Sequence, residues 1–243
     1  MKVGIVAEGP ADIAVIRNIL KGKLGVEVKD TQTLRPRLNE DTTDLAERRA
    51  APFRPQAPEE YSNWSLVLEE CRARGKIEDF LLNPIAGERL VVIHIDTAEA
   101  HLPGYDIDRP DRKVHDYGDR LRALVAAKLD ALLGPELIAG IRYAIAIEET
   151  EAWVLTIHED QDDRDTGARL DPKKRLRFVL DGKASKGKTR EKKSREEGRG
   201  TKKSEYELYE EWSIEFREGD QLEACAERNR SLRLFVDSLT PPA

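Results

Sequence analysis

Three short apolar runs, each followed by an acidic residue, set the pattern of the chain. The runs cover residues 2–7 (KVGIVA), 90–95 (LVVIHI) and 142–147 (RYAIAI), and all three contain β-branched residues. Continuous apolar runs of this length predict strands that are buried on both faces, as in a parallel sheet. Apolar and polar residues alternate over 24–31, which predicts one further strand.

Helices are predicted between and after these strands. Apolar residues at helical spacing favour helices over 10–22, 64–75 and 115–133, and two closing helices over 204–212 and 222–239. A further helix is predicted to begin at the acidic residues 148–151. Residues 34–60 are polar and Pro-rich, and we assign them no regular structure. The alternation of strands and helices predicts an α/β fold, with a mainly parallel sheet flanked by helices and a C-terminal helical extension.

The domain organisation follows from length and charge. A chain of 243 residues accommodates one α/β core with an appendage. We predict an α/β domain over 1–160, a basic flexible segment over 161–203, and C-terminal helices over 204–243 that pack on the core. The net charge of -6 conceals an asymmetry, because 173–203 holds 14 Lys and Arg against 4 Asp and Glu (14 - 4 = +10), which leaves -16 elsewhere.

The basic segment has two interpretations of equal weight. It is either a solvated loop or an arm that contacts the phosphates of DNA or RNA without sequence specificity. The residues that would make such contacts are Lys183, Lys186, Lys188, Arg190, Lys192 and Lys193. Tyr206, Tyr209 and Trp212 follow at helical spacing; they could stack on bases, although such a stripe is more often part of a core.

Composition excludes several classes of protein. Charged residues make up 36% of the chain and the mean hydropathy is -0.61, so we expect a cytoplasmic protein with no membrane partner. Glu8 interrupts the apolar start before a signal-peptide core could form. The two cysteines lack the spacing of a zinc site, and no phosphate-binding loop, dinucleotide fingerprint or serine nucleophile motif is present.

Acidic residues follow all three apolar strands. Glu8 ends the first, Asp96 the second, and Glu148, Glu149 and Glu151 the third. Because the carboxyl ends of parallel strands share one edge of the sheet, these carboxylates would repel one another unless a cation lay between them. Mg²⁺ or Mn²⁺, which prefer oxygen ligands, would suit such a site.

A structural alternative stands beside this hypothesis. Acids at the start of a helix often serve only as caps, and Asp12 and Glu148 fit that role best. His94 and Asp96 lie two apart on one strand and share a face, the geometry of an H-x-D metal pair. No second histidine is near them in sequence, so we interpret His94 as a half-buried strand residue.

The order of these motifs resembles that of Toprim domains. Residues 5–12 (IVAEGPAD) are similar to the Glu-Gly motif of that family, and 92–97 (VIHIDT) are similar to its Asp-bearing strand. Residues 149–153 (ETEAW) and 229–239 resemble two motifs of small, uncharacterised bacterial Toprim-like proteins, which are related to OLD-family nucleases. The resemblance spans most of the chain, and each motif by itself is short.

The resemblance implies roles for particular residues. Glu8 would be a metal ligand or general acid/base, Asp96 the principal Mg²⁺ ligand, and Glu149 or Glu151 an accessory ligand. The family usually has a second Asp two positions after the first, where this chain has Ala98 followed by Glu99. Either Glu99 replaces that ligand or a second metal site is lost.

The resemblance also implies a function. The expected activity is a Mg²⁺-dependent (or Mn²⁺-dependent) nuclease or related phosphodiester-processing enzyme acting on DNA or RNA, with antiphage defence as the biological setting. The alternative is a catalytically degenerate Toprim module that binds nucleic acid or a partner ATPase, which Ala98 favours. A topoisomerase or primase is disfavoured because the chain is short.

Overall fold

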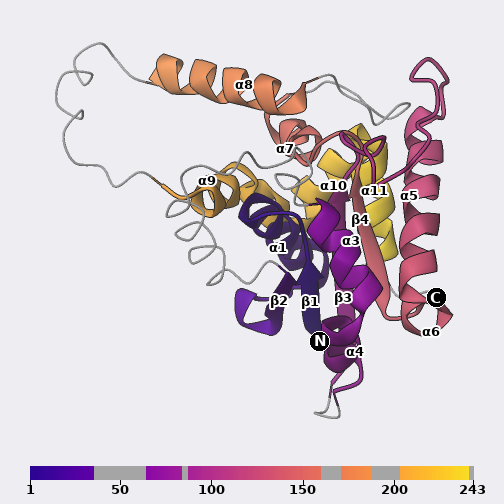
Figure 1. Ribbon diagram of the computed structural model, residues 1–243. Coiled ribbons are helices and arrows are strands. Elements are labelled where there is room, and N and C mark those ends of the chain that lie inside the picture. The colour runs from indigo at the N-terminus through magenta and orange to yellow at the C-terminus, as the bar shows by residue number, and fades with distance from the viewer. Residues whose placement is uncertain (36–63, 84–86, 160–170, 188–202, 241–243) are drawn as a thin grey trace, which may run out of the picture.

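The computed structural model describes residues 1–35, 64–83, 87–159, 171–187 and 203–240, with the backbone alone for 183–187 (Figure 1). The strands are β1 (Lys2–Val6), β2 (Thr31–Arg35), β3 (Arg89–Asp96) and β4 (Ile141–Ala146). The helices are α1 (Pro10–Leu24), α3 (Trp64–Ala73), α4 (Gly75–Leu81), α5 (Tyr117–Leu133), α6 (Pro135–Ile138), α7 (Glu151–His158), α8 (Pro172–Gly187), α9 (Glu205–Trp212), α10 (Gly219–Arg228) and α11 (Arg230–Ser238). Two short 3-10 turns, η1 (Val28–Asp30) and η3 (Ile214–Arg217), complete the described elements.

The four strands form one sheet in the order β2-β1-β3-β4, and every pair is parallel. The predicted α/β fold, with a parallel sheet flanked by helices and a C-terminal helical extension, is confirmed and is consistent with a Toprim-like fold. Val6 of β1 pairs with Ile93 of β3, and Asp96 pairs with Ala146 of β4. This register brings the residues that follow β1, β3 and β4 to one edge of the sheet.

Successive residues of the strands pack into two different cores. On β3, Leu90 and Val92 face α1, α7 and the C-terminal helices, whereas Val91 and Ile93 face α3, α4 and α5. This period-2 alternation with apolar residues on both sides explains why the strand reads as a continuous apolar run. His94 continues the first of these faces.

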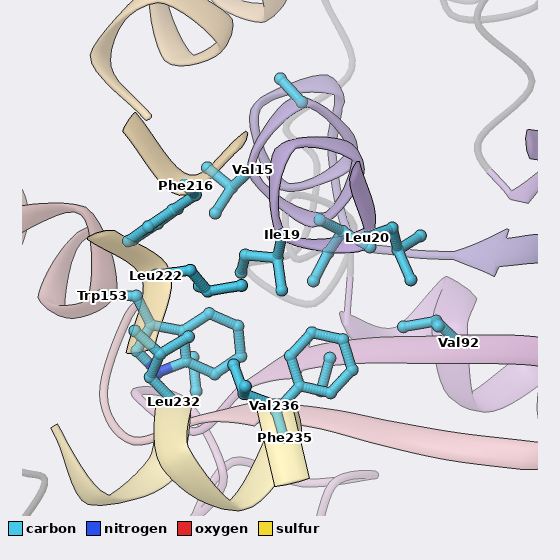
Figure 2. Close-up of a cluster of buried hydrophobic side chains, with 14 of the residues drawn as sticks. Val15, Ile19, Leu20, Val92, Trp153, Phe216, Leu222, Leu232, Phe235 and Val236 are labelled. Atoms are coloured by element: carbon cyan, nitrogen blue, oxygen red, sulfur yellow. The ribbon is translucent and has the colours of Figure 1, made fainter. Parts of the chain in front are cut away.

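The C-terminal helices complete the first core rather than forming a separate unit. Figure 2 shows Trp153 of α7 beside Phe235 of α11, and their rings stack with centroids 5.8 Å apart. The Trp153 indole N–H donates to the Ser231 hydroxyl at 2.7 Å. A Cβ added to Gly22 would lie 2.0 Å from the Phe216 carbonyl oxygen, so only glycine permits this approach of α1 to η3.

Two predicted elements were wrong in their bounds. Residues 24–31 are not a strand, because α1 continues to Leu24 and ends at Gly25 in the left-handed conformation (φ 66°), so that the strand begins at Thr31. The single helix predicted over 222–239 is two helices. Asn229 has extended backbone (φ -139°), and its side chain accepts the Leu232 N–H to cap α11.

The prediction of a basic flexible segment over 161–203 was wrong for Pro172–Gly187, which form α8. Leu176 is fully buried and anchors this helix to the core beside α7, an apolar contact that the segment's high charge concealed. Most of the Pro-rich stretch 34–60 lies outside the described residues, apart from the end of β2. Within the described parts of the chain, no helix has the length and apolar character that a membrane crossing requires.

Candidate metal centre

The candidate site lies at the carboxyl edge of the sheet, where three separate chain segments meet. Glu8 follows β1, and Asp12 lies in the first turn of α1. His94 and Asp96 end β3, and Thr150 directly precedes α7. The parallel register of the strands places these segments together, because each strand delivers its next residue to the same edge.

A single buried hydroxyl joins three of these side chains. Thr150 Oγ1 lies 2.8 Å from Asp12 Oδ1, 2.8 Å from His94 Nε2 and 3.0 Å from Asp96 Oδ1. Asp12 also caps α1, because its Oδ2 accepts the Gly9 N–H at 2.9 Å. The cap role predicted for Asp12 is therefore present, and its second oxygen faces the site.

The protons available to this group are limited. A threonine hydroxyl has one hydrogen, so it can donate to only one of the two carboxylates. Burial lowers the pKa of His94, which favours the neutral imidazole. Because the Thr150 hydroxyl donates to a carboxylate, we assign the metal-free tautomer in which the His94 Nε2–H donates to Thr150. Whichever of Asp12 and Asp96 does not receive the Thr150 hydrogen must itself be protonated to form a hydrogen bond with Thr150 Oγ1.

Burial and nearby charges raise the pKa of two acidic groups of the site, Asp96 and Glu8. Loss of hydration raises the pKa of Asp96 well above its usual range, and the charges of Asp12, Glu8 and Glu151 add to the rise. Loss of hydration likewise raises the pKa of Glu8, followed by the charge of Asp12. Glu8 is held by the Asp96 backbone N–H, which donates to its Oε1 at 2.6 Å. Burial and neighbouring charges therefore favour the protonated forms of Glu8 and Asp96 in the absence of a cation.

The triad of Asp12, His94 and Asp96 has the composition and spacing of a metal-binding group. His94 Nε2 lies 4.0 Å from Asp12 Oδ1 and 3.6 Å from Asp96 Oδ1, and the three donor atoms lie within 4.8 Å of one another. A neutral imidazole offers a lone pair, and a cation would relieve the repulsion between the carboxylates. Among the described residues, no other group of His, Cys, Asp and Glu meets this spacing.

One feature of His94 differs from a fully supported metal ligand. Its Nδ1 is buried and has no hydrogen-bond partner within the described part of the chain. Metal-binding histidines usually donate this second N–H to an acceptor that fixes the ring. Here the edge-on contact with Trp153, with ring centroids 5.9 Å apart, orients the imidazole instead.

The other predicted metal ligands lie around the triad and already have partners. The exposed Glu99 accepts the Trp64 indole N–H at 2.8 Å. Glu149 accepts the Lys173 backbone N–H at 3.2 Å, and the buried Glu151 accepts the Tyr209 hydroxyl and pairs with Lys173 Nζ at 3.7 Å. Of the predicted acids, Glu8 and Asp96 contact each other directly, whereas Glu99, Glu149 and Glu151 have separate partners.

Glu148 belongs to a separate ion-pair cluster at the same edge. Its carboxylate accepts from Arg109 at 2.6 Å and from the Tyr117 hydroxyl at 3.0 Å, and it pairs with Arg112 at 2.9 Å. Its backbone is left-handed (φ 67°), and its carbonyl oxygen accepts the Ala98 N–H at 2.9 Å. These contacts fix the loop that follows Asp96, so Glu148 supports the site without joining it.

The predicted phosphate-contacting residues fall at the margin of the described structure. Lys183 and Lys186 lie in the last turns of α8, where the backbone alone is described. Lys188, Arg190, Lys192 and Lys193 lie outside the described residues. Tyr209 is buried, and Tyr206 and Trp212 pack against the core, as the structural alternative for this stripe predicted.

Sequence reasoning gave too little weight to three residues of the site. The H-x-D spacing did indicate His94, and the position of Asp12 one helical turn after Glu8 placed it at the same strand end. Nothing in the local pattern indicated Thr150, whose role depends on contacts with residues 138 and 56 positions away.

Comparisons of the chain with protein-family models, with curated proteins and with solved structures find no match. The geometry of the site therefore carries the functional argument.

Proposed function

We propose that this chain is a divalent-metal-dependent nuclease or related phosphodiester-processing enzyme, in which Asp12, His94 and Asp96 hold the metal ion. The observation that carries the proposal is the convergence of two carboxylates and a neutral imidazole on one buried hydroxyl, at the edge of a parallel sheet where ligands bind. The resemblance of 5–12 and 92–97 to Toprim motifs supports the same reaction class.

The donor set favours Mn²⁺ over Mg²⁺. Mg²⁺ is bound almost entirely by oxygen and retains several waters, whereas Mn²⁺ accepts carboxylates and binds nitrogen donors more tightly than Mg²⁺. His94 supplies that nitrogen. When bound, such an ion would lower the pKa of a water molecule and neutralise charge on the phosphoryl oxygens.

The other side chains of the site position the ligands and handle the proton. Thr150 holds Asp12, His94 and Asp96 at their mutual distances. Glu8 is fixed by the Asp96 backbone N–H, and its raised pKa favours a carboxyl group that can hold a proton. We assign it the general acid/base role that the resemblance implies. Glu151 and Glu149 keep the start of α8 beside the site through Lys173.

A cleavage assay tests the proposal. The purified chain is incubated with plasmid, single-stranded DNA and RNA in Mn²⁺, Mg²⁺ or EDTA, beside Asp96→Asn, Asp12→Asn, Glu8→Gln and the control Asp237→Asn on the exposed side of α11. We expect cutting in Mn²⁺, a loss of about 100-fold or more for the Asp96 and Asp12 variants, and a loss of about 100-fold for Glu8→Gln. Asp237→Asn should cut like the wild type.

The last variant in the assay is Ala98→Asp, which introduces the second carboxylate that Toprim domains usually have at this position. If neither the wild type nor Ala98→Asp cuts any substrate with any divalent metal, the nuclease proposal is refuted. Cutting by the wild type that is unaffected by Asp96→Asn and Asp12→Asn would refute the assignment of the site.

The second candidate function is a catalytically degenerate module that binds nucleic acid or a partner ATPase. Two observations favour it: Ala98 lacks a carboxylate, and the Thr150 hydroxyl already lies within hydrogen-bonding distance of all three members of the triad. Isothermal titration with Mn²⁺ discriminates the two candidates. A chain that retains nucleic-acid or ATPase binding but takes up no Mn²⁺ would support the degenerate module.

A further inference from the structure

Helix α8 has one side against the core and one side facing outward. Figure 1 shows α8 as an outer helix next to α7, on the side of the molecule where the metal centre lies. Leu176 is fully buried, and Val179 and Leu180 pack against the first core. Lys174, Arg177 and Phe178 are exposed. The helix therefore holds its place through one narrow apolar stripe.

The outward face combines an exposed aromatic ring with positive charge. Phe178 is 68% exposed, although burial of a phenylalanine is normally favourable. Lys174 lies one turn before it, and the Arg175 guanidinium lies over its ring at 5.5 Å from the centroid. Asp181 is the one acidic residue among the exposed side chains described on this helix. An exposed ring among cations is the arrangement that proteins use to stack on nucleobases and pair with phosphates.

The first turn of α8 is tied to the metal centre. The Lys173 backbone N–H donates to Glu149 and its Nζ pairs with Glu151, the two residues on either side of Thr150. Thr150 in turn contacts the whole triad. A nucleic-acid strand bound along α8 would therefore pass close to the proposed site of phosphodiester cleavage.

We propose that the outer face of α8 binds single-stranded nucleic acid, with a base stacked on Phe178 and phosphates paired with Lys174 and Arg177. This inference rests on the proposed function and narrows its substrate class. A single strand is favoured over a duplex because only unpaired bases expose the faces that an aromatic side chain can stack on.

Binding measurements separate this surface from catalysis. Fluorescence anisotropy is recorded in EDTA with labelled 20-nucleotide poly-dT, poly-U and a blunt DNA duplex, for the wild type, Phe178→Ala, Phe178→Tyr and the control Leu124→Ala. Leu124 is an exposed apolar residue of α5, 42% exposed, away from α8. We expect Phe178→Ala to bind the single strands about 5- to 100-fold more weakly, with Phe178→Tyr and Leu124→Ala close to the wild type.

The contribution of charge is tested by one further variant. Replacing Lys174 and Arg177 by Gln should reduce the dependence of log K on log salt by about 0.7 for each phosphate that the variant no longer pairs with. Because binding is measured in EDTA, in the absence of cleavage, failure of the nuclease proposal does not alter this result. The inference is overturned if Phe178→Ala binds single strands as tightly as the wild type, or if Phe178→Tyr loses as much affinity as Phe178→Ala. Tighter binding of the duplex than of the single strands would also overturn it.

Discussion

Replacing Thr150 by Val removes the hydroxyl on which the triad converges while keeping the shape of the side chain. The hydroxyl donates to one carboxylate and accepts from His94, and hydrogen bonds to charged groups contribute about 1.5–3 kcal/mol each. Counting one charged and one neutral bond, we expect the free energy of unfolding to fall by about 2–4 kcal/mol in EDTA. The magnitude is high because His94 is fully buried and Asp12 and Asp96 are largely buried, so each loses a hydrogen bond where solvent replaces it poorly.

Thr156 provides the matched control. It is as buried as Thr150 and lies in α7, and its hydroxyl has only uncharged partners: it donates to the Trp153 carbonyl oxygen at 2.6 Å and hydrogen-bonds with the Cys225 thiol. Thr156→Val should therefore cost only about 1 kcal/mol. Urea unfolding followed by tryptophan fluorescence measures both variants. If Thr150→Val is no less stable than Thr156→Val, the hydroxyl does not hold the triad together and the geometry that we assign to the site is refuted.

Three further predictions concern pH, metal binding and packing. Glu8 and Asp96 keep protons in the folded state that the unfolded chain has lost, so their contribution to stability falls as pH rises from about 4 through their raised pKa values. In urea unfolding at pH 4–8, the free energy of unfolding of Asp96→Asn should therefore fall less steeply with pH than that of the wild type. A steeper fall would contradict this prediction. Mn²⁺ at 100 times its Kd should raise the free energy of unfolding of the wild type by about 2.7 kcal/mol, as measured by thermal unfolding, and that of His94→Gln by much less. An equal rise in both proteins would show that His94 is not a metal ligand. Phe235→Ala should cost about 3–5 kcal/mol because the ring is fully buried against Trp153, whereas Phe178→Ala should leave the urea midpoint nearly unchanged; a similar loss in both would show that Phe178 is not exposed in solution.

Local sequence patterns were enough to predict the fold class. The apolar runs at 2–7, 90–95 and 142–147 form β1, β3 and β4 to within about two residues, as expected when a strand is buried on both faces. The same patterns placed Glu8 and Asp96 at a common edge, where the two residues contact each other. These features depend on neighbours in sequence and on the geometry of parallel strands.

Tertiary structure alone decided where α8 and the closing helices begin and end, and which residues complete the site. The charge of α8 concealed the buried contact of Leu176, and only a cap at Asn229 divides α10 from α11. Thr150 is an ordinary residue between two acids in sequence, yet the fold brings it to Asp12 and His94 from 138 and 56 positions away. Sequence periodicity reports which face of an element is buried, whereas a site assembled from three segments depends on the register between strands, which no local pattern contains.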